Sequence, residues 1–197
     1  MGSNLISAGI FLIQVLFGLY LFFLILRFVL QASRADFYNP VCQAIIRITD
    51  PVVKPLRTFI PSWRAIDFAT LVASLVLQLV MISLITLMLG GPIFHSIFLA
   101  WSFVGLLSTL IDIYFFALII MIIASWIAPY NNHPALMLIY QITEPLCRPA
   151  RRLIPPMGGL DFSVMIVILA LILFDQYLVI RPLAEALGMP KGLILGL

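Results

Sequence analysis

The chain repeats one short polar motif, and this internal repeat constrains the fold more than any other feature. The motif reads TDPVVKPLRTFIP at 49–61 and TEPLCRPARRLIP at 143–155, and the two copies align without a gap at an offset of 94 residues. Each copy lies between long apolar runs. The pattern predicts two tandem membrane hairpins, residues 1–92 and 93–197, each of which has kept the same polar connection.

Composition indicates a membrane protein. Hydrophobic residues make up 63% of the chain and charged residues only 10%, against roughly 25% charged in soluble domains. A membrane-spanning helix needs about 20 apolar residues, and four windows satisfy this: 5–26, 68–89, a helix centred on 99–124 within 93–128, and 162–180. We predict one helix in the third window, because residues 110–113 offer no Gly or Pro for a turn. The expected fold is an all-α membrane protein with four transmembrane helices.

The basic residues predict the orientation of these helices. Nine of the eleven Lys and Arg residues lie in the two repeated connections, whereas residues 1–26 and the connection 90–98 have none. Basic connections stay on the cytoplasmic side of a membrane. Both connections are therefore expected to be cytoplasmic, with both termini on the other side.

Each connection is predicted to begin with a helix. Asn39 and His133 are both followed by proline, which is typical of a helix N-cap and first helical position. Pro51 and Pro145 are expected to end these helices, because the residue before a proline is pushed out of the α region. The acidic residue before each proline would then cap a second, short helix.

The second half of each connection is basic and amphipathic, which is typical of a segment lying in the membrane interface. Basic side chains there attract anionic headgroups with about 1 kcal/mol each. The residues predicted to bind lipid or a partner are Lys54, Arg57, Arg148, Arg151 and Arg152. Two interpretations remain open: a structural elbow that returns the chain to the next span, or a rigid docking surface. The two aspartates of the structural motif are expected to cap the following spans. The whole motif comprises Pro51, Pro55, Pro61, Asp67, Pro145, Pro149, Pro155 and Asp161.

Two carboxylates fall inside the predicted spans. Asp112 and Asp175 are each about 20 Å from the cytoplasmic side at 1.5 Å per residue, so they could share a proton or a cation. Alternatively, a shift of the helices would bring both to the outer interface. The first repeat has Gly18 and Met81 at these positions, so any such site belongs to one half only. Arg27, at the end of the first span, is explained by snorkelling toward the interface.

Known catalytic motifs are missing from the sequence, and an enzyme is not expected. It has no P-loop, G-x-G-x-x-G, G-x-S-x-G or H-E-x-x-H motif. The two histidines lack converging ligands for zinc or haem. We therefore expect no metal and no cofactor, and we find no argument for nucleic-acid contact.

The repeated motif resembles a known family. The pattern D/E-P-x-x-K/R-P-x-R-x-x-I-P, followed by Asp before an apolar helix, occurs twice and resembles the YggT/YlmG family of small bacterial and plastid membrane proteins. The resemblance covers nearly the whole chain. The second copy keeps the fuller family ending at 158–161, whereas the first has Arg64 and Ala65 in place of the glycines. The two-copy form resembles the proteobacterial inner-membrane branch, which implies periplasmic termini.

The resemblance implies a non-enzymatic role. Members of the family are linked to ion or osmotic homeostasis, to septum and nucleoid organisation and, in plastids, to cytochrome maturation. We expect a membrane scaffold or assembly factor that acts through membrane or cytoplasmic partners or as a homo-oligomer. The alternative is an ion or proton pathway, formed by an oligomer around Asp112 and Asp175.

Overall fold

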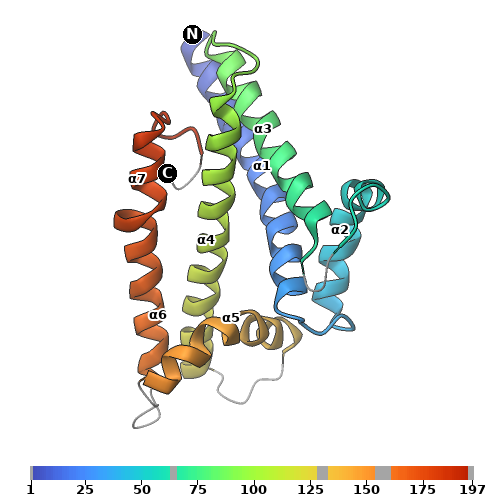
Figure 1. Cartoon of the computed structure of the whole chain (residues 1–197), viewed down its shortest axis with the longest axis vertical. Helices are drawn as coiled ribbons and strands as arrows, with labels where there is room; N and C mark the ends of the chain where they lie inside the picture. Colours follow the sequence, from blue (N-terminus) through green and yellow to red (C-terminus); the bar gives the residue numbers. More distant parts are fainter. Residues whose placement is uncertain (1, 63–65, 128–132, 154–160, 195–197) are drawn as a thin grey trace.

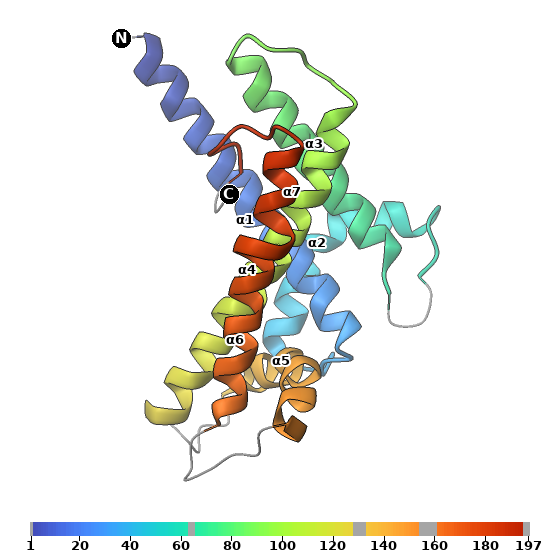
Figure 2. The ribbon, with the colours of Figure 1, turned by 60° about the vertical axis from the view of Figure 1, so that its left-hand side comes forward.

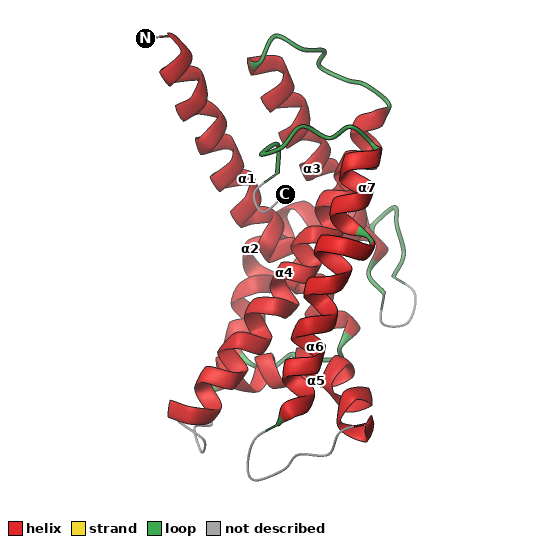
Figure 3. Ribbon diagram, turned by 90° about the vertical axis from the view of Figure 1, so that its left-hand side faces the viewer, coloured by secondary structure: helices red, strands yellow, loops and turns green. Residues whose placement is uncertain are grey.

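The computed structural model of the chain describes residues 2–62, 66–127, 133–153 and 161–194 (Figure 1). These residues are almost entirely helical (Figure 3). The helices are α1 (Gly2–Ala32), α2 (Pro40–Arg57), α3 (Phe68–Met88), α4 (Ile97–Ile127), α5 (Pro134–Leu153), α6 (Phe162–Leu173), the π-helical turn η1 (Phe174–Leu178) and α7 (Ile180–Ala186).

Among the described residues, four helical segments are long and apolar enough to cross a membrane. They are α1, α3, α4 and the combined segment from α6 to α7, with 29, 21, 31 and 25 residues in the apolar segments. The prediction of an all-α membrane protein with four spans is confirmed. The third span is a single helix, since α4 continues without interruption through residues 110–113.

The spans form two hairpins joined along α4. Helix α1 packs most extensively on α3, and α4 contacts both of them as well as α6 and α7. The N-terminal turns of α1 extend away from the other helices (Figures 2 and 3). Helix α5 lies at the end of the bundle opposite the N-terminus, and α2 lies beside the C-terminal half of α1 (Figure 1). The two connecting helices also contact each other.

The apolar faces of α2 and α5 pack against the spans in the same way in both repeats. Val53 of α2 and Leu24 of α1 are both fully buried in one core, with Ala69 and Ala73 of α3. At an offset of 94 residues, Cys147 of α5 and Leu118 of α4 are fully buried in the equivalent core, which also contains Val164 and Val167 of α6. The internal repeat of the sequence therefore corresponds to an equivalent packing of each connecting helix on its two spans.

The caps predicted at the start of the connecting helices are confirmed. The Asn39 side chain accepts a hydrogen bond from the backbone N–H of Val41 at 2.9 Å. His133 Nδ1 accepts one from Ala135 at 3.2 Å. The Asn39 amide also donates to the carbonyl of Pro134 at 2.8 Å, which ties the first repeat to the second.

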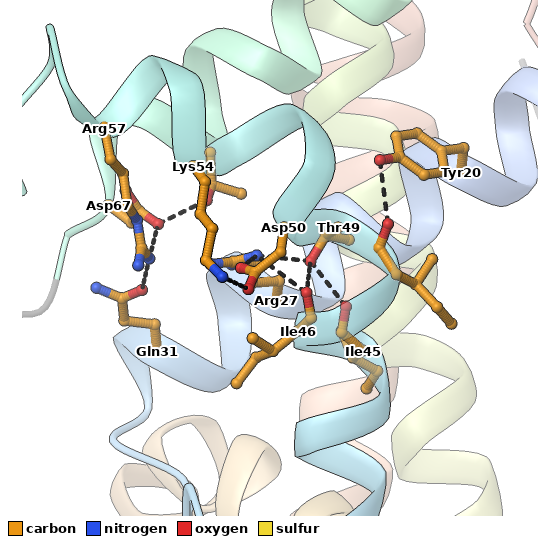
Figure 4. A network of polar contacts seen from close by, with 12 residues as sticks. Tyr20, Arg27, Gln31, Ile45, Ile46, Thr49, Asp50, Lys54, Arg57 and Asp67 are labelled. Carbon is orange, nitrogen blue, oxygen red and sulfur yellow. Dashed lines mark hydrogen bonds and ion pairs between the residues drawn. The ribbon is translucent and has the colours of Figure 1, made fainter.

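The prediction that Pro51 and Pro145 end their helices is wrong. Helix α2 continues to Arg57 and α5 to Leu153, with both prolines of each copy inside the helix. A proline loses one backbone hydrogen bond and displaces the carbonyl four residues earlier, which bends a helix without necessarily ending it. The ribbon of α2 changes direction along its length (Figure 4). Burial of Val53 beyond the first proline stabilises the continued helix.

The fourth span, predicted over 162–180, contains the π-helical turn η1. The Val179 N–H donates to the Phe174 carbonyl at 2.9 Å, five residues back. Pro182 explains this local change, because it cannot donate to the residue 178 carbonyl and its ring crowds that group. Asp175 lies in η1, and π-turns are frequent at functional sites.

Candidate functional site

The two repeats share an arginine–aspartate pair at equivalent positions. Arg57 Nη2 bonds Asp67 Oδ2, and Arg151 Nε bonds Asp161 Oδ2 at 2.8 Å. Each pair connects the end of a connecting helix to the start of the next span (Figure 4 shows the first). The two differ in burial, because Asp67 is 0% exposed and Asp161 is 29% exposed. The arginine and the aspartate of the motif therefore act together to close each hairpin.

The two aspartates begin α3 and α6 in different ways. Asp161 caps α6 as predicted, accepting from the Ser163 N–H at 3.1 Å. Asp67 occupies the N-cap position of α3, but its carboxylate bonds to the side chains of Arg57 and Thr70. Burial acts to raise the pKa of Asp67, but the bonds from Arg57 and Thr70 outweigh it and hold the pKa below its ordinary value.

Arg27 takes part in a buried polar cluster that the sequence analysis missed. Its side chain is only 4% exposed, so the snorkelling interpretation is wrong. Arg27 Nη1 donates to Thr49 Oγ1 at 2.8 Å and to Asp50 Oδ1 at 2.9 Å (Figure 4). Lys54 Nζ lies 3.0 Å from the other oxygen of the same carboxylate. Burial acts to raise the pKa of Asp50, but the bonds from Lys54 and Arg27 outweigh it and lower that pKa.

The second repeat has different contacts at the positions of this cluster. The residue equivalent to Arg27 is Met121, and its sulfur accepts a hydrogen bond from Thr143 at 3.4 Å. Glu144, equivalent to Asp50, pairs with Arg151 at 2.7 Å. Equivalent positions of the two halves thus make different polar contacts.

The five basic residues predicted to bind lipid or a partner fall into two groups. Arg57 and Arg151 are used within the protein, as described above. The other three are exposed on the connecting helices: Lys54, Arg148 and Arg152. Of these, Lys54 also pairs with Asp50. Pro61 follows the end of α2, and Pro155 lies outside the described residues.

The structure brings the two intramembrane carboxylates together. Asp112 of α4 and Asp175 of η1 line one pocket of about 180 Å³, which Gln176 and Arg181 also line. Both carboxylates are half-buried. The sequence predicted that the two carboxylates lie at similar depth, and in the structure they line the same pocket between α4 and the fourth span.

Asp112 also lines a second pocket, which is mainly apolar and which the sequence analysis missed. This pocket has a volume of about 280 Å³ and lies among α1, α3 and α4. Three further polar side chains line it: Gln14, Gln78 and Thr109. The sequence does contain an indication of these polar groups, since both glutamines interrupt apolar stretches of predicted spans.

A site made of several metal-binding side chains is not seen in the part of the chain that the structure describes. No group of three or more His, Cys, Asp and Glu residues is placed there to hold a metal ion. Of the two pockets around Asp112, one adds two amides and a hydroxyl to this carboxylate. The other adds Asp175, Gln176 and Arg181.

The two halves of the chain each match the same family model. The model of the CCB3/YggT family matches residues 6–88 and again 100–182. These two segments are also offset by 94 residues, so the family unit coincides with one hairpin. No solved structure matches the chain.

Relatives of similar length come from several bacteria. The chain is 45% identical over 189 residues to an uncharacterised protein of Pseudomonas aeruginosa, covering 95% of each chain. It is 42% identical over 163 residues to an uncharacterised protein of Vibrio alginolyticus, covering 82% of this chain and 88% of the relative. The uncharacterised protein YggT of Escherichia coli is 35% identical over 185 residues, covering 94% of each chain. With two family matches and full-length relatives, the chain belongs to the CCB3/YggT family.

Proposed function

We propose that the protein is a non-enzymatic scaffold or assembly factor of the bacterial inner membrane, with α2 and α5 as its contact surface. The observation that carries this proposal is the duplicated, rigidly held pair of connecting helices. Each is docked by its apolar face on the spans and closed by an arginine–aspartate pair. A surface that is already ordered loses little conformational entropy when a partner binds.

The exposed basic side chains support the proposal that α2 and α5 form the contact surface. Lys54 is 73% exposed, and Arg148 and Arg152 are also exposed. These cations are suited to anionic headgroups or to an acidic partner segment. We propose that the surface faces the cytoplasm and rests against anionic lipid.

Crosslinking followed by affinity capture tests the proposed scaffold function. The intact chain is expected to enrich specific membrane or cytoplasmic proteins over an unrelated membrane protein of equal abundance. A triple variant, Lys54→Ser with Arg148→Ser and Arg152→Ser, should lose most of this enrichment. Lys191→Ser is the matched control, since it removes an exposed cation from the C-terminal segment, outside the connecting helices. Equal recovery with the intact chain and with the unrelated protein would refute the scaffold.

The orientation can be checked by labelling single cysteines. Cys42 and Cys147 are buried, so both are replaced by alanine before Arg152→Cys or Lys191→Cys is introduced. A membrane-impermeant thiol reagent added to intact spheroplasts is expected to modify position 191 and not position 152. The reverse pattern would place both connections on the periplasmic side.

A second candidate function is an ion or proton pathway, which the shared pocket of Asp112 and Asp175 favours. Four spans are few to enclose a pore, so conduction would require an oligomer. Ion flux into proteoliposomes that contain the intact protein should then disappear in Asp112→Asn or Asp175→Asn. Parent liposomes no leakier than empty ones would eliminate this candidate.

A further inference from the structure

Gln78 is the most unusual polar side chain in the described part of the chain. It lies in the middle of α3 and is 1% exposed, yet neither its Nε2 nor its Oε1 has a hydrogen-bond partner among the described residues. A buried amide without partners costs roughly 1–3 kcal/mol in proteins. Gln78 lines the pocket that Asp112 shares with Gln14 and Thr109. An unpaired amide in the lining of a pocket leaves polar atoms available to a ligand bound there.

The lining of this pocket is mainly apolar, and each of its four polar side chains can offer an oxygen. The Gln14 Nε2 already donates to the carbonyls of Gly192 and Leu193, at 2.7 and 3.2 Å, so its oxygen is the atom it can offer. The Thr109 hydroxyl donates to the Gly105 carbonyl at 2.9 Å and can still accept. Together with the Asp112 carboxylate and the Gln78 oxygen, three helices supply four oxygen groups. Hard cations prefer such ligands.

The local charge favours a single positive charge. Asp112, Asp175 and Arg181 line the adjoining pocket. Two carboxylates and one guanidinium leave one negative charge uncompensated when all are ionised. Inside a membrane an uncompensated charge is expensive, and it is normally paired. A monovalent cation would balance the charge, whereas a divalent cation would leave an excess.

The walls of the pocket are close-packed. Gly105 of α4 faces Gln78 so closely that a Cβ there would lie 2.5 Å from Gln78 Nε2 and 2.6 Å from the Ile194 side chain. Ile194 is buried and lines the same pocket. The C-terminal segment thus forms part of the wall, held by Gln14.

We propose that Asp112, Gln78, Gln14 and Thr109 form an intramembrane binding site for one monovalent metal cation, hydrated by the water the pocket can also hold. The Asp112 carboxylate supplies the balancing charge, and the three neutral groups supply further oxygens. This site requires neither the scaffold function nor conduction, because a cation bound at rest would stabilise the packing of α1, α3 and α4.

Direct binding tests the site. The full-length protein in lipid nanodiscs is titrated with radioactive sodium and, separately, with radioactive rubidium as the potassium analogue, with choline chloride keeping the ionic strength constant. We expect saturable binding of one of these ions. Asp112→Asn should abolish binding, and Gln78→Met should weaken it about tenfold, as expected for the loss of one good ligand. Gln43→Met and Glu185→Gln, both at exposed positions, are the matched controls and should bind as the parent does.

Stability provides a second, independent readout if Asp112→Asn does not fold. In choline alone, Gln78→Met should be at least as stable as the parent, because it removes a buried unpaired amide. Addition of the bound cation should raise the thermal midpoint of the parent more than that of Gln78→Met. The proposal is overturned if no saturable binding occurs, which would mean that the pocket holds water only. It is also overturned if stabilisation follows pH and not the metal cation, or if Asp175→Asn abolishes binding while Gln78→Met leaves it unchanged.

Discussion

Replacing Asp50 with alanine is expected to destabilise the protein by about 3–5 kcal/mol, the usual cost of leaving a buried charge without its partner. The charge left behind is the guanidinium of Arg27, which is 4% exposed and lies 2.9 Å from the Asp50 carboxylate. Thr49 would remain as its only side-chain acceptor among the contacts described. The free energy of unfolding in mixed micelles, measured by titration with dodecyl sulfate, gives the effect.

The second repeat indicates a suitable control for this experiment. Met121 stands at the position equivalent to Arg27, so Arg27→Met should fit the site. The double variant Arg27→Met with Asp50→Ala should then recover most of the stability lost in Asp50→Ala. Lys54→Ala, which removes only an exposed partner, should cost no more than about 1 kcal/mol. If Asp50→Ala is no more harmful than Lys54→Ala, the buried pair does not support the fold.

The arginine of the repeated motif is expected to matter more in the first repeat than in the second. Arg57→Ala leaves the Asp67 carboxylate, which is 0% exposed, without its cation, at an expected cost of about 3 kcal/mol. Arg151→Ala leaves Asp161 and Glu144, which are 29% and 51% exposed and can be hydrated, so about 1 kcal/mol is expected. Unfolding titrations of the two variants at neutral pH measure the difference.

The pH dependence of Arg57→Ala identifies the cause. In the parent the folded-state pKa of Asp67 is held below its ordinary value of 3.8. The carboxylate therefore stabilises the fold above that pH, and this contribution disappears as the pH falls through the lowered folded pKa. Without Arg57, burial is less opposed and should raise the folded-state pKa. The stability difference between Arg57→Ala and the parent should then shrink as the pH falls toward 4. Arg152→Ala should show no such trend, and a pH-independent difference for Arg57→Ala would exclude the stranded carboxylate as the cause.

The sequence by itself determined the features that depend on local pattern and length. The offset of 94 residues predicted two equivalent hairpins, and the family matches at 6–88 and 100–182 repeat that offset. Apolar length predicted the four spans, including the single helix α4. The caps at Asn39 and His133 were predictable as well. Each of these features is set by residues close together along the chain, so reading them requires no knowledge of packing.

The tertiary structure alone decided which polar groups meet. Arg27 was read as a membrane-edge residue, because its burial depends on how α2 docks against α1. Helix α2 continues through Pro51 because Val53 beyond it is buried in the core with Leu24. Gln14 and Gln78 interrupt apolar stretches of the sequence, but their meeting with Asp112 depends on the rotation of three helices about their own axes. Local patterns show which residues occupy a helix. The contacts between helices, on which burial and charge pairing depend, are set only when the whole bundle packs.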